Sequence, residues 1–416
     1  MIILIYFLLL FLFLYFPLKN RSIALILILI QILSLSGGFF IGKEYPIDSI
    51  PRLLNLFITI IILTLVIIPW TRISNISNIT FTNEIRLKKL TRFLIWMSII
   101  PFLVFSFVSI FVFLYVDDIN AFKYSEGVSM EFYYSLPINT KFLIFSNYIY
   151  NLSYFLIPLH FYYLSRRKFK LSFICLVLSF NVVLYGLTYF SRSAFTHYGL
   201  IYMSFFFILS PTLDRKFKKN LKIAILSFGV LFVSYFVYIS NQRFTQDNLY
   251  AESIPSSSLI QDPVLYSYVD YLSQWYNNNM YVLDTFDSKT FNGQTSLQPV
   301  LTLLKYFNIG SFDSKEYLAL RMKLWPLHWY KFNGFVAYSI YDYGYILAIL
   351  FSGFYFYVVR RNMPKKNTIS LVSLFVLVLL IQIPLMAIFY STVSAIIFPV
   401  LFLIPIYFYL KVKPIN

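Results

Sequence analysis

The hydrophobic residues of this chain gather in runs close to the roughly twenty residues that a helix needs to cross a hydrocarbon core about 30 Å thick. Short polar segments separate these runs. The pattern therefore predicts an all-α polytopic membrane protein with about eleven transmembrane helices. We place them at 2–18, 22–42, 53–70, 93–116, 141–164, 171–190, 194–210, 223–240, 333–358, 368–389 and 391–410. The first run lacks a basic start and a small-residue cleavage site, so we expect a retained helix rather than a signal peptide.

The longest break in hydrophobicity spans 241–332 and contains two helix-start signals. Asp262 followed by Pro263 pairs a good N-cap residue with a proline at the first helical position. Asp313, with Glu316 three residues later, has the spacing of a capping box. Apolar residues after the first start recur at three- and four-residue steps, as in an amphipathic helix: Leu265, Tyr268, Val269, Leu272, Trp275, Tyr276 and Leu283. We predict a small helical subdomain lying on the membrane.

Lysine and arginine concentrate in alternate loops, which the positive-inside rule assigns to the cytoplasm. Of the acidic residues, only Glu84 and Asp214 lie among these basic clusters. With eleven spans, the N-terminus is then outside, the C-terminus inside, and the large loop outside. The predicted organisation is helices 1–8 over 1–240, an extracytoplasmic loop over 241–332 and helices 9–11 over 333–416.

Composition excludes several classes of protein. Hydrophobic residues make up 59% of the chain and charged residues only 12%, against about 25% charged in soluble domains. The net charge of +17 lies in clusters between apolar runs rather than on one soluble face, so we expect no nucleic-acid partner. Cys175 is the single cysteine, and the chain lacks HExxH, P-loop and GxSxG motifs. We therefore predict neither a metal ion nor another cofactor.

Arg192 is the most informative charged residue. It lies in Ser191-Arg192-Ser193, in a tight turn between two predicted spans on the outside. An arginine at membrane depth costs roughly 2.5 to 3.5 kcal/mol on insertion scales, so it should face a cavity or an anionic partner. An arginine reaching up to lipid headgroups is the structural alternative.

Two further arginines lie on the predicted outer side of the membrane. Arg243 follows the eighth predicted span, and Arg321 lies in the second predicted loop helix. A guanidinium group offers two parallel N–H donors that match phosphate oxygens, and it stays charged at physiological pH. Several such groups around one cavity would suit a lipid-linked pyrophosphate. The structural alternative for Arg321 is an ordinary charge on a solvated helix face.

Other residues are candidates for binding and proton transfer. Trp275 and Tyr276 could stack on sugars, although aromatic residues also form belts at membrane interfaces. Asp342, inside a predicted span, should be paired with an arginine or lie in a site. His328 has an unperturbed pKa near neutrality, so either it or Asp270 could accept a proton.

A set of short motifs resembles the bacterial oligosaccharide repeat-unit polymerases (Wzy-type O-antigen and capsule polymerases) and, more distantly, the O-antigen ligases. The motifs are the Ser191-Arg192-Ser193 turn, Arg243 after the next span, the large outside loop, Phe291-Asn292-Gly293-Gln294-Thr295, Asn333-Gly334-Phe335, Tyr341-Asp342-Tyr343-Gly344-Tyr345, and Gly353. They cover about 190–355, whereas the likeness in architecture covers the whole chain.

The resemblance implies a metal-independent glycosyltransferase in the bacterial cytoplasmic membrane. Such an enzyme transfers a growing glycan from undecaprenyl pyrophosphate to the sugar of another lipid-linked repeat unit on the outer face, forming O-antigen or capsular polysaccharide. Arg192, Arg243, Asp270 and His328 would then be catalytic candidates, and Arg321, Trp275, Tyr276 and Asp342 would bind substrate. A chain-length regulator and a flippase of the same pathway would be partners, besides the lipid bilayer.

Two alternatives stay open at this point. An O-antigen ligase would pass the glycan to lipid A core, and a lipid-linked oligosaccharide flippase would move it without chemistry. A transporter of this kind would carry charges through a central pathway and need no large folded outer loop. Arg52, in a smaller outside loop, is expected to tolerate substitution as a peripheral arginine.

Overall fold

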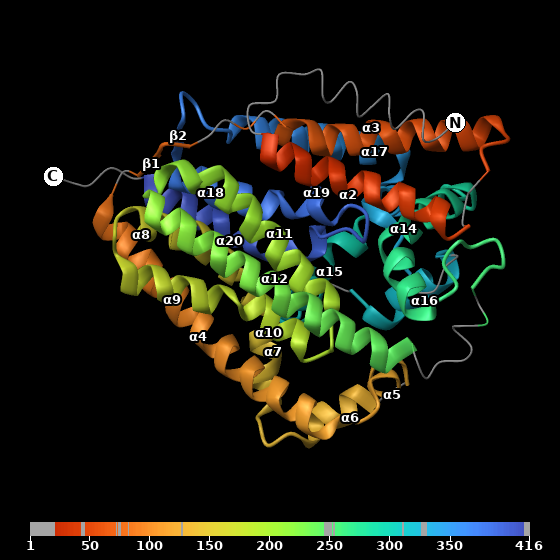
Figure 1. The fold of residues 1–416 in the computed structure, drawn as a ribbon, viewed down its shortest axis with the longest axis horizontal. Coiled ribbons are helices and arrows are strands. Elements are labelled where there is room, and N and C mark those ends of the chain that lie inside the picture. Colours follow the sequence, from red (N-terminus) through yellow and green to blue (C-terminus); the bar gives the residue numbers. More distant parts are fainter. Residues whose placement is uncertain are drawn as a thin grey trace. The chain divides into compact units, whose positions relative to one another are not determined.

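The computed structural model describes residues 21–42, 46–71, 73, 76–81, 83–125, 128–244, 252, 254–309, 312–325 and 331–411. This part of the chain is almost entirely helical (Figure 1). Its two short strands, β1 (Asn78–Thr80) and β2 (Thr368–Ser370), pair in parallel with Ile79 opposite Ile369. The predicted all-α class is confirmed. The first predicted span, 2–18, lies outside the described residues.

Eight described helices are long and apolar enough to cross a membrane: Ile50–Thr71, Glu84–Tyr115, Thr140–Ser165, Phe169–Leu187, Arg192–Thr212, Arg215–Gln242, Gly334–Arg361 and Val393–Leu410. Each corresponds to one predicted span. The predicted spans at 22–42 and 368–389 correspond to shorter apolar helices, Leu25–Phe40 and Leu371–Met386. The polytopic membrane architecture is therefore evident from length and hydropathy.

The chain forms two compact units, each made of segments far apart in sequence. Unit 1 comprises Met1–Ser74, Leu249–Met363 and Leu380–Phe398; unit 2 comprises Asn75–Asn248, Pro364–Leu379 and Pro399–Asn416. The loop helices of 241–332 belong to unit 1, together with apolar helices from both ends of the sequence.

Unit 1 is built around α14, the long helix of the loop. Its helices are α2 (Arg21–Phe40), α3 (Ile50–Thr71), α14 (Pro263–Asp284), α15 (Gln294–Tyr306), α16 (Ser314–Leu324), α17 (Gly334–Arg361) and α19 (Gln382–Met386). Helix α14 packs against α2, α3 and α17, and α3 runs beside α17 (Figure 1). A Cβ atom added at Gly37 of α2 would lie 2.9 Å from the Cβ of Ser273, so only glycine permits this approach.

The packing of α14 adds to what the sequence predicted. The sequence predicted a helical subdomain lying on the membrane, and the structure shows that α14 buries side chains along its length and packs against the apolar helices α2, α3 and α17. Its predicted start is confirmed, because the Asp262 side chain accepts a hydrogen bond from the Leu265 N–H at 2.7 Å and Pro263 begins the helix. Leu265 and Leu272 of the predicted apolar set are exposed, whereas Trp275, Tyr276 and Leu283 are buried.

Unit 2 contains most of the central helices: α4 (Glu84–Tyr115), α5 (Ile119–Tyr124), α6 (Val128–Ser135), α7 (Thr140–Ile149), α8 (Leu156–Ser165), α9 (Phe169–Ser179), α10 (Asn181–Leu187), α11 (Arg192–Leu209), α12 (Arg215–Phe244) and α18 (Leu371–Leu380). Two 3-10 turns, η1 (Tyr150–Phe155) and η2 (Ser210–Thr212), join neighbouring helices, and α20 (Val393–Lys411) is shared by the two units. The predicted spans at 141–164 and 171–190 are thus each divided into shorter helical segments.

Candidate functional site

The turn between α10 and α11 is as tight as the sequence predicted. Phe190 adopts a left-handed conformation with φ 48°. The Ser191 N–H donates to the Gly186 carbonyl at 2.8 Å, and the Phe190 N–H donates to the Leu187 carbonyl at 3.2 Å. These bonds form a Schellman motif, which ends α10 and starts α11 at once. A Cβ at Gly186 would lie only 2.2 Å from the Cβ of Ala194, so the two helices touch here.

Arg192, the first residue of α11, is buried in unit 2 and only 5% exposed. Its Nη1 donates to the Ser240 Oγ at 2.6 Å, and its guanidinium carbon lies 4.6 Å from the centre of the Phe236 ring. Both of these neighbours belong to α12. Arg192 is therefore enclosed by its own unit rather than extended to lipid headgroups.

Two short helices, α5 and α6, contribute to the same turn. The Tyr133 hydroxyl donates to the Thr188 carbonyl at 2.6 Å, and the Lys123 Nζ donates to the Phe190 carbonyl at 3.3 Å. These bonds satisfy carbonyl groups that a helix leaves without a partner at its C-terminus. They also bring a second cation, Lys123, to the turn that holds Arg192. The sequence analysis did not single out Lys123, because its pairing with Phe190 bridges 67 residues.

Arg243 lies in the last turn of α12, three residues after Ser240. Residues three apart are neighbours on a helix surface, so its backbone is close to the helix face that meets Arg192. The side chain of Arg243 is outside the described part of the structure. The two predicted catalytic arginines are therefore brought to neighbouring backbone positions in one unit.

Asp342 of unit 1 is a helix cap. Its Oδ1 accepts the Thr295 N–H at 3.0 Å and its Oδ2 accepts the Ser296 N–H at 2.8 Å, which satisfies the first turn of α15. The backbones also pair, since the Gly293 N–H donates to the Asp342 carbonyl at 2.9 Å. Gly344, with φ 77°, interrupts the helical geometry of α17 two residues later.

The two motifs around 291–295 and 341–345, which the sequence showed only as separate segments, therefore meet in one contact. The sequence analysis considered Asp342 as a partner of an arginine or part of a site, and the structure adds a role as a helix cap. This carboxylate, 1% exposed, is occupied by backbone N–H groups. The sequence analysis also missed α15, because a glycine with φ 79° rather than an Asp or Ser precedes it.

Trp275 and Tyr276 are packing residues of unit 1. Trp275 is 1% exposed, donates its indole N–H to the Ser34 hydroxyl and lies against Gly334, where a Cβ would come within 2.9 Å of the ring. Tyr276 is buried too, and burial raises the pKa of its hydroxyl. Rings enclosed by their own chain present no open face, so the expected sugar stacking on Trp275 and Tyr276 is not supported.

Arg321 lies in a polar and aromatic cluster of unit 1. The side chains of Arg321 and Asn333 both lie close to the Tyr338 hydroxyl. Tyr338 stacks on Trp325 with ring centres 4.9 Å apart. Within the described residues, the Trp325 Nε1 and both amide atoms of Asn333 are buried without a hydrogen-bond partner. The sequence analysis named Arg321 but not Tyr338.

Three further residues were singled out from the sequence: Asp270, His328 and Asp313. Asp270 lies half-buried on α14, and His328 lies outside the described residues. Asp313 caps α16 as predicted, since it accepts the Lys315 N–H at 2.8 Å, and this bond holds the pKa of the Asp313 carboxyl below its usual range.

No group of three His, Cys, Asp or Glu side chains among the described residues could hold a metal ion.

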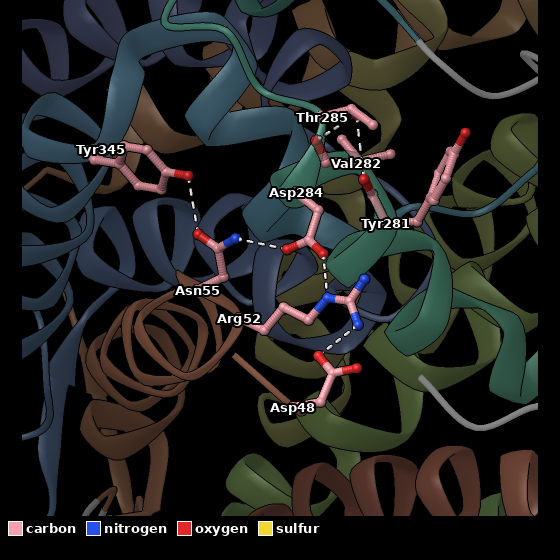
Figure 2. A network of polar contacts seen from close by, with 8 residues as sticks. All are labelled: Asp48, Arg52, Asn55, Tyr281, Val282, Asp284, Thr285 and Tyr345. Atoms are coloured by element: carbon pink, nitrogen blue, oxygen red, sulfur yellow. Dashed lines mark hydrogen bonds and ion pairs between the residues drawn. The ribbon is translucent and has the colours of Figure 1, made fainter. Parts of the chain in front are cut away.

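A polar network that the sequence analysis missed joins three helices of unit 1 (Figure 2). Asp284, at the end of α14, accepts the Arg52 Nε at 2.7 Å and the Asn55 Nδ2 at 3.0 Å. Arg52 also pairs with Asp48 at 2.7 Å, and the Tyr345 hydroxyl donates to the Asn55 Oδ1 at 2.9 Å. Arg52 is therefore not a peripheral residue, contrary to expectation. Its pairing with Asp284 bridges 232 residues, so no local pattern could reveal it.

Comparisons with protein-family models, with curated proteins and with solved structures give no match to the chain.

Proposed function

We propose that the protein is a membrane glycosyltransferase that joins oligosaccharide repeat units carried on a polyprenyl pyrophosphate. In this proposal eleven helices cross the cytoplasmic membrane, with the N-terminus and the loop 241–332 outside and the C-terminus inside. The growing glycan is transferred on the outer face, which makes the protein a polymerase of O-antigen or capsular polysaccharide.

The observation that carries the proposal is the environment of Arg192. Arg192 is a buried guanidinium group, which stays charged at physiological pH and can match phosphate oxygens with two parallel N–H donors. The pyrophosphate of a lipid-linked donor is an anion that approaches from the membrane. Lys123 at the same turn adds positive charge, and the backbone of Arg243 lies one helical turn beyond Ser240.

The chemistry requires little beyond positioning and charge. A hydroxyl of the acceptor sugar attacks the anomeric carbon of the donor, the bond from that carbon to the pyrophosphate oxygen breaks, and the acceptor proton passes to a base. Arg192 stabilises the charge that develops on the leaving pyrophosphate, which is usually the largest electrostatic contribution in such a site. Asp270 and His328 stay candidates for the base.

The test compares polymer length distributions in cells that carry variants at matched membrane abundance. Arg192→Lys keeps the charge but loses the two parallel N–H donors, so it should shorten the polymer. Arg192→Ala should leave single repeat units. One charge-assisted contact is worth about 1.5 to 3 kcal/mol, or roughly ten- to a hundredfold in rate.

The matched control is Arg361→Ala, which removes an exposed arginine whose described bond is to Tyr357. It should leave the polymer unchanged. Normal polymer from Arg192→Ala at full abundance would refute the assigned site. Complete absence of surface glycan, including single units, would instead indicate a ligase or a transporter, because either defect prevents any repeat unit from reaching the surface acceptor.

A further inference from the structure

The segment formed by α15 and α16, described over 294–309 and 312–325, leaves many of its apolar side chains uncovered by the rest of unit 1. Ser296 is the only buried residue among the 13 of α15. Tyr306 and Met322 are 79% and 75% exposed. The exposed large apolar side chains of this segment are Leu297, Leu304, Tyr306, Phe307, Ile309, Leu318 and Met322.

These helices are too short to cross a membrane, yet they are amphipathic. A helix of 13 residues is about 20 Å long, well below the thickness of the hydrocarbon core. On α15, Leu297, Leu301 and Leu304 follow one face at three- and four-residue steps, and Gln298 and Lys305 follow another. This pattern is typical of a helix that lies in the plane of the membrane interface.

The charges of the α15–α16 segment favour binding to an anionic surface. Lys305, Lys315 and Lys323 are exposed, and Arg321 adds a fourth basic residue, against the acidic residues Asp313 and Glu316. Asp313 is already engaged as the cap of α16 and by Lys305 at 3.8 Å. The remaining lysines flank Leu318 and Met322, so long basic side chains surround exposed apolar ones. Lysines in this arrangement can reach lipid phosphates while their stems cover apolar surface.

Helix α17 places the start of α15 beside a change in the exposure of its own side chains. Before the kink at Gly344, α17 is mostly enclosed by its own unit, and Phe335, Ala337 and Tyr341 are buried. After the kink, Ile346, Leu347, Leu350 and Phe354 are exposed in this membrane-spanning helix. Asp342, which caps α15, lies two residues before that change. The cap therefore fixes the N-terminus of α15 beside the point where α17 begins to expose apolar side chains.

We infer that the α15–α16 segment binds the surface of an anionic bilayer. Its apolar side chains enter the boundary between headgroups and acyl chains, and Lys305, Lys315 and Lys323 contact lipid phosphates. The inference does not depend on the proposed glycosyltransferase activity.

The test measures the depth of nitroxide labels on the full-length protein in lipid nanodiscs. After Cys175→Ala, single cysteines replace Leu304 or Phe307, and Gln298 on the polar face of α15 and Lys289 in the preceding loop serve as matched controls. Oxygen concentrates in acyl chains, whereas a nickel chelate stays in water. In discs containing phosphatidylglycerol, labels at 304 and 307 should be relaxed more by oxygen and less by nickel than labels at 298 and 289.

Two further comparisons can overturn the inference. Combined Lys305→Gln, Lys315→Gln and Lys323→Gln substitutions should lower the oxygen-to-nickel ratio in phosphatidylglycerol discs to the value found in phosphatidylcholine discs. Equal nickel access at all four label positions would show that the segment stands in water. Exclusion of both reagents from 304 and 307 would show that protein, such as a second copy of the chain, covers this face.

Discussion

Two buried charged residues, Arg192 and Asp342, illustrate how the same sequence signal can have different meanings. Both are 5% exposed or less. Asp342 receives two backbone N–H groups and so has a complete local role as a cap. Arg192 donates to the Ser240 hydroxyl and lies against the Phe236 ring of α12. The two charges therefore differ: Asp342 caps a helix, whereas Arg192 is held beside α12, where we propose that it binds the pyrophosphate.

Substitution of Asp342 tests this distinction. Asp342→Ala removes the cap of α15 and leaves two buried N–H groups unsatisfied, so it should destabilise the protein by about 1 to 3 kcal/mol. Thermal unfolding in detergent should show the loss, and limited proteolysis should cut 294–325 faster. Asp342→Asn keeps one acceptor oxygen and should fall between Ala and wild type. Unchanged stability and proteolysis together with lost polymer would assign Asp342 to the active site instead.

At the scale of elements, glycines decide how closely helices approach. Gly186 of α10 faces Ala194 of α11 with no room for a methyl group, whereas Gly229 of α12 has nothing within 4 Å of its hypothetical Cβ. Both lie in helices of unit 2, and both appear in the sequence as isolated glycines in apolar runs. Only the contact in space separates a glycine needed for packing from one that merely weakens a helix.

The pair gives a prediction with a built-in control. Gly186→Ala must move α11 and the Arg192 turn, and overpacking of this kind costs about 1 to 3 kcal/mol. Gly229→Ala should be neutral or stabilise the helix by up to about 1 kcal/mol, because alanine is the better helix former. Apparent midpoints of thermal unfolding in detergent compare the two variants. Equal midpoints would mean that α10 and α11 are not held as closely as the structure indicates.

The network around Asp284 joins elements rather than residues, since it connects α3, α14 and α17 (Figure 2). The side chains of Asp284 and Arg52 are 17% and 28% exposed, so the pair is partly screened by solvent. A double-mutant cycle with Arg52→Leu and Asp284→Leu should give a coupling free energy of roughly 1 to 2 kcal/mol, between the values typical of exposed and buried pairs.

A third substitution in the same network serves as a control for this cycle. Tyr345→Phe removes only the bond to Asn55, so it should cost less than either single substitution of the ion pair. A coupling free energy near zero would show that Asp284 and Arg52 stabilise the unit independently of each other, and that the network does not hold α14 to α3.

At the scale of the whole molecule, the open question is which way the helices cross the membrane. The basic clusters predict that 241–332 is outside and that the loop after α17 is inside. Single cysteines at Ser256, Ser288 and Asn362, in a Cys175→Ala background, can be probed with an impermeant thiol reagent. In intact cells the first two should react and Asn362 should not. Reaction at Asn362 alone would reverse the topology.

The sequence by itself determined the helical class, the approximate positions of ten described apolar segments, and two helix starts at Asp262 and Asp313. These features depend on hydrophobic length and on local capping, which residues near each other in the chain decide. It also marked the tight turn at Arg192, because two apolar runs there are separated by only a few residues.

Only the tertiary structure decided the roles of Asp342, Trp275 and Arg52. Each of these side chains meets partners tens to hundreds of residues away: the start of α15, the face of α2 and the end of α14. In an apolar chain many pairings satisfy the same hydrophobic pattern, so the choice among them depends on shape and on which polar groups find partners. The shape of the contacts and the pairing of polar groups exist only after the helices have packed.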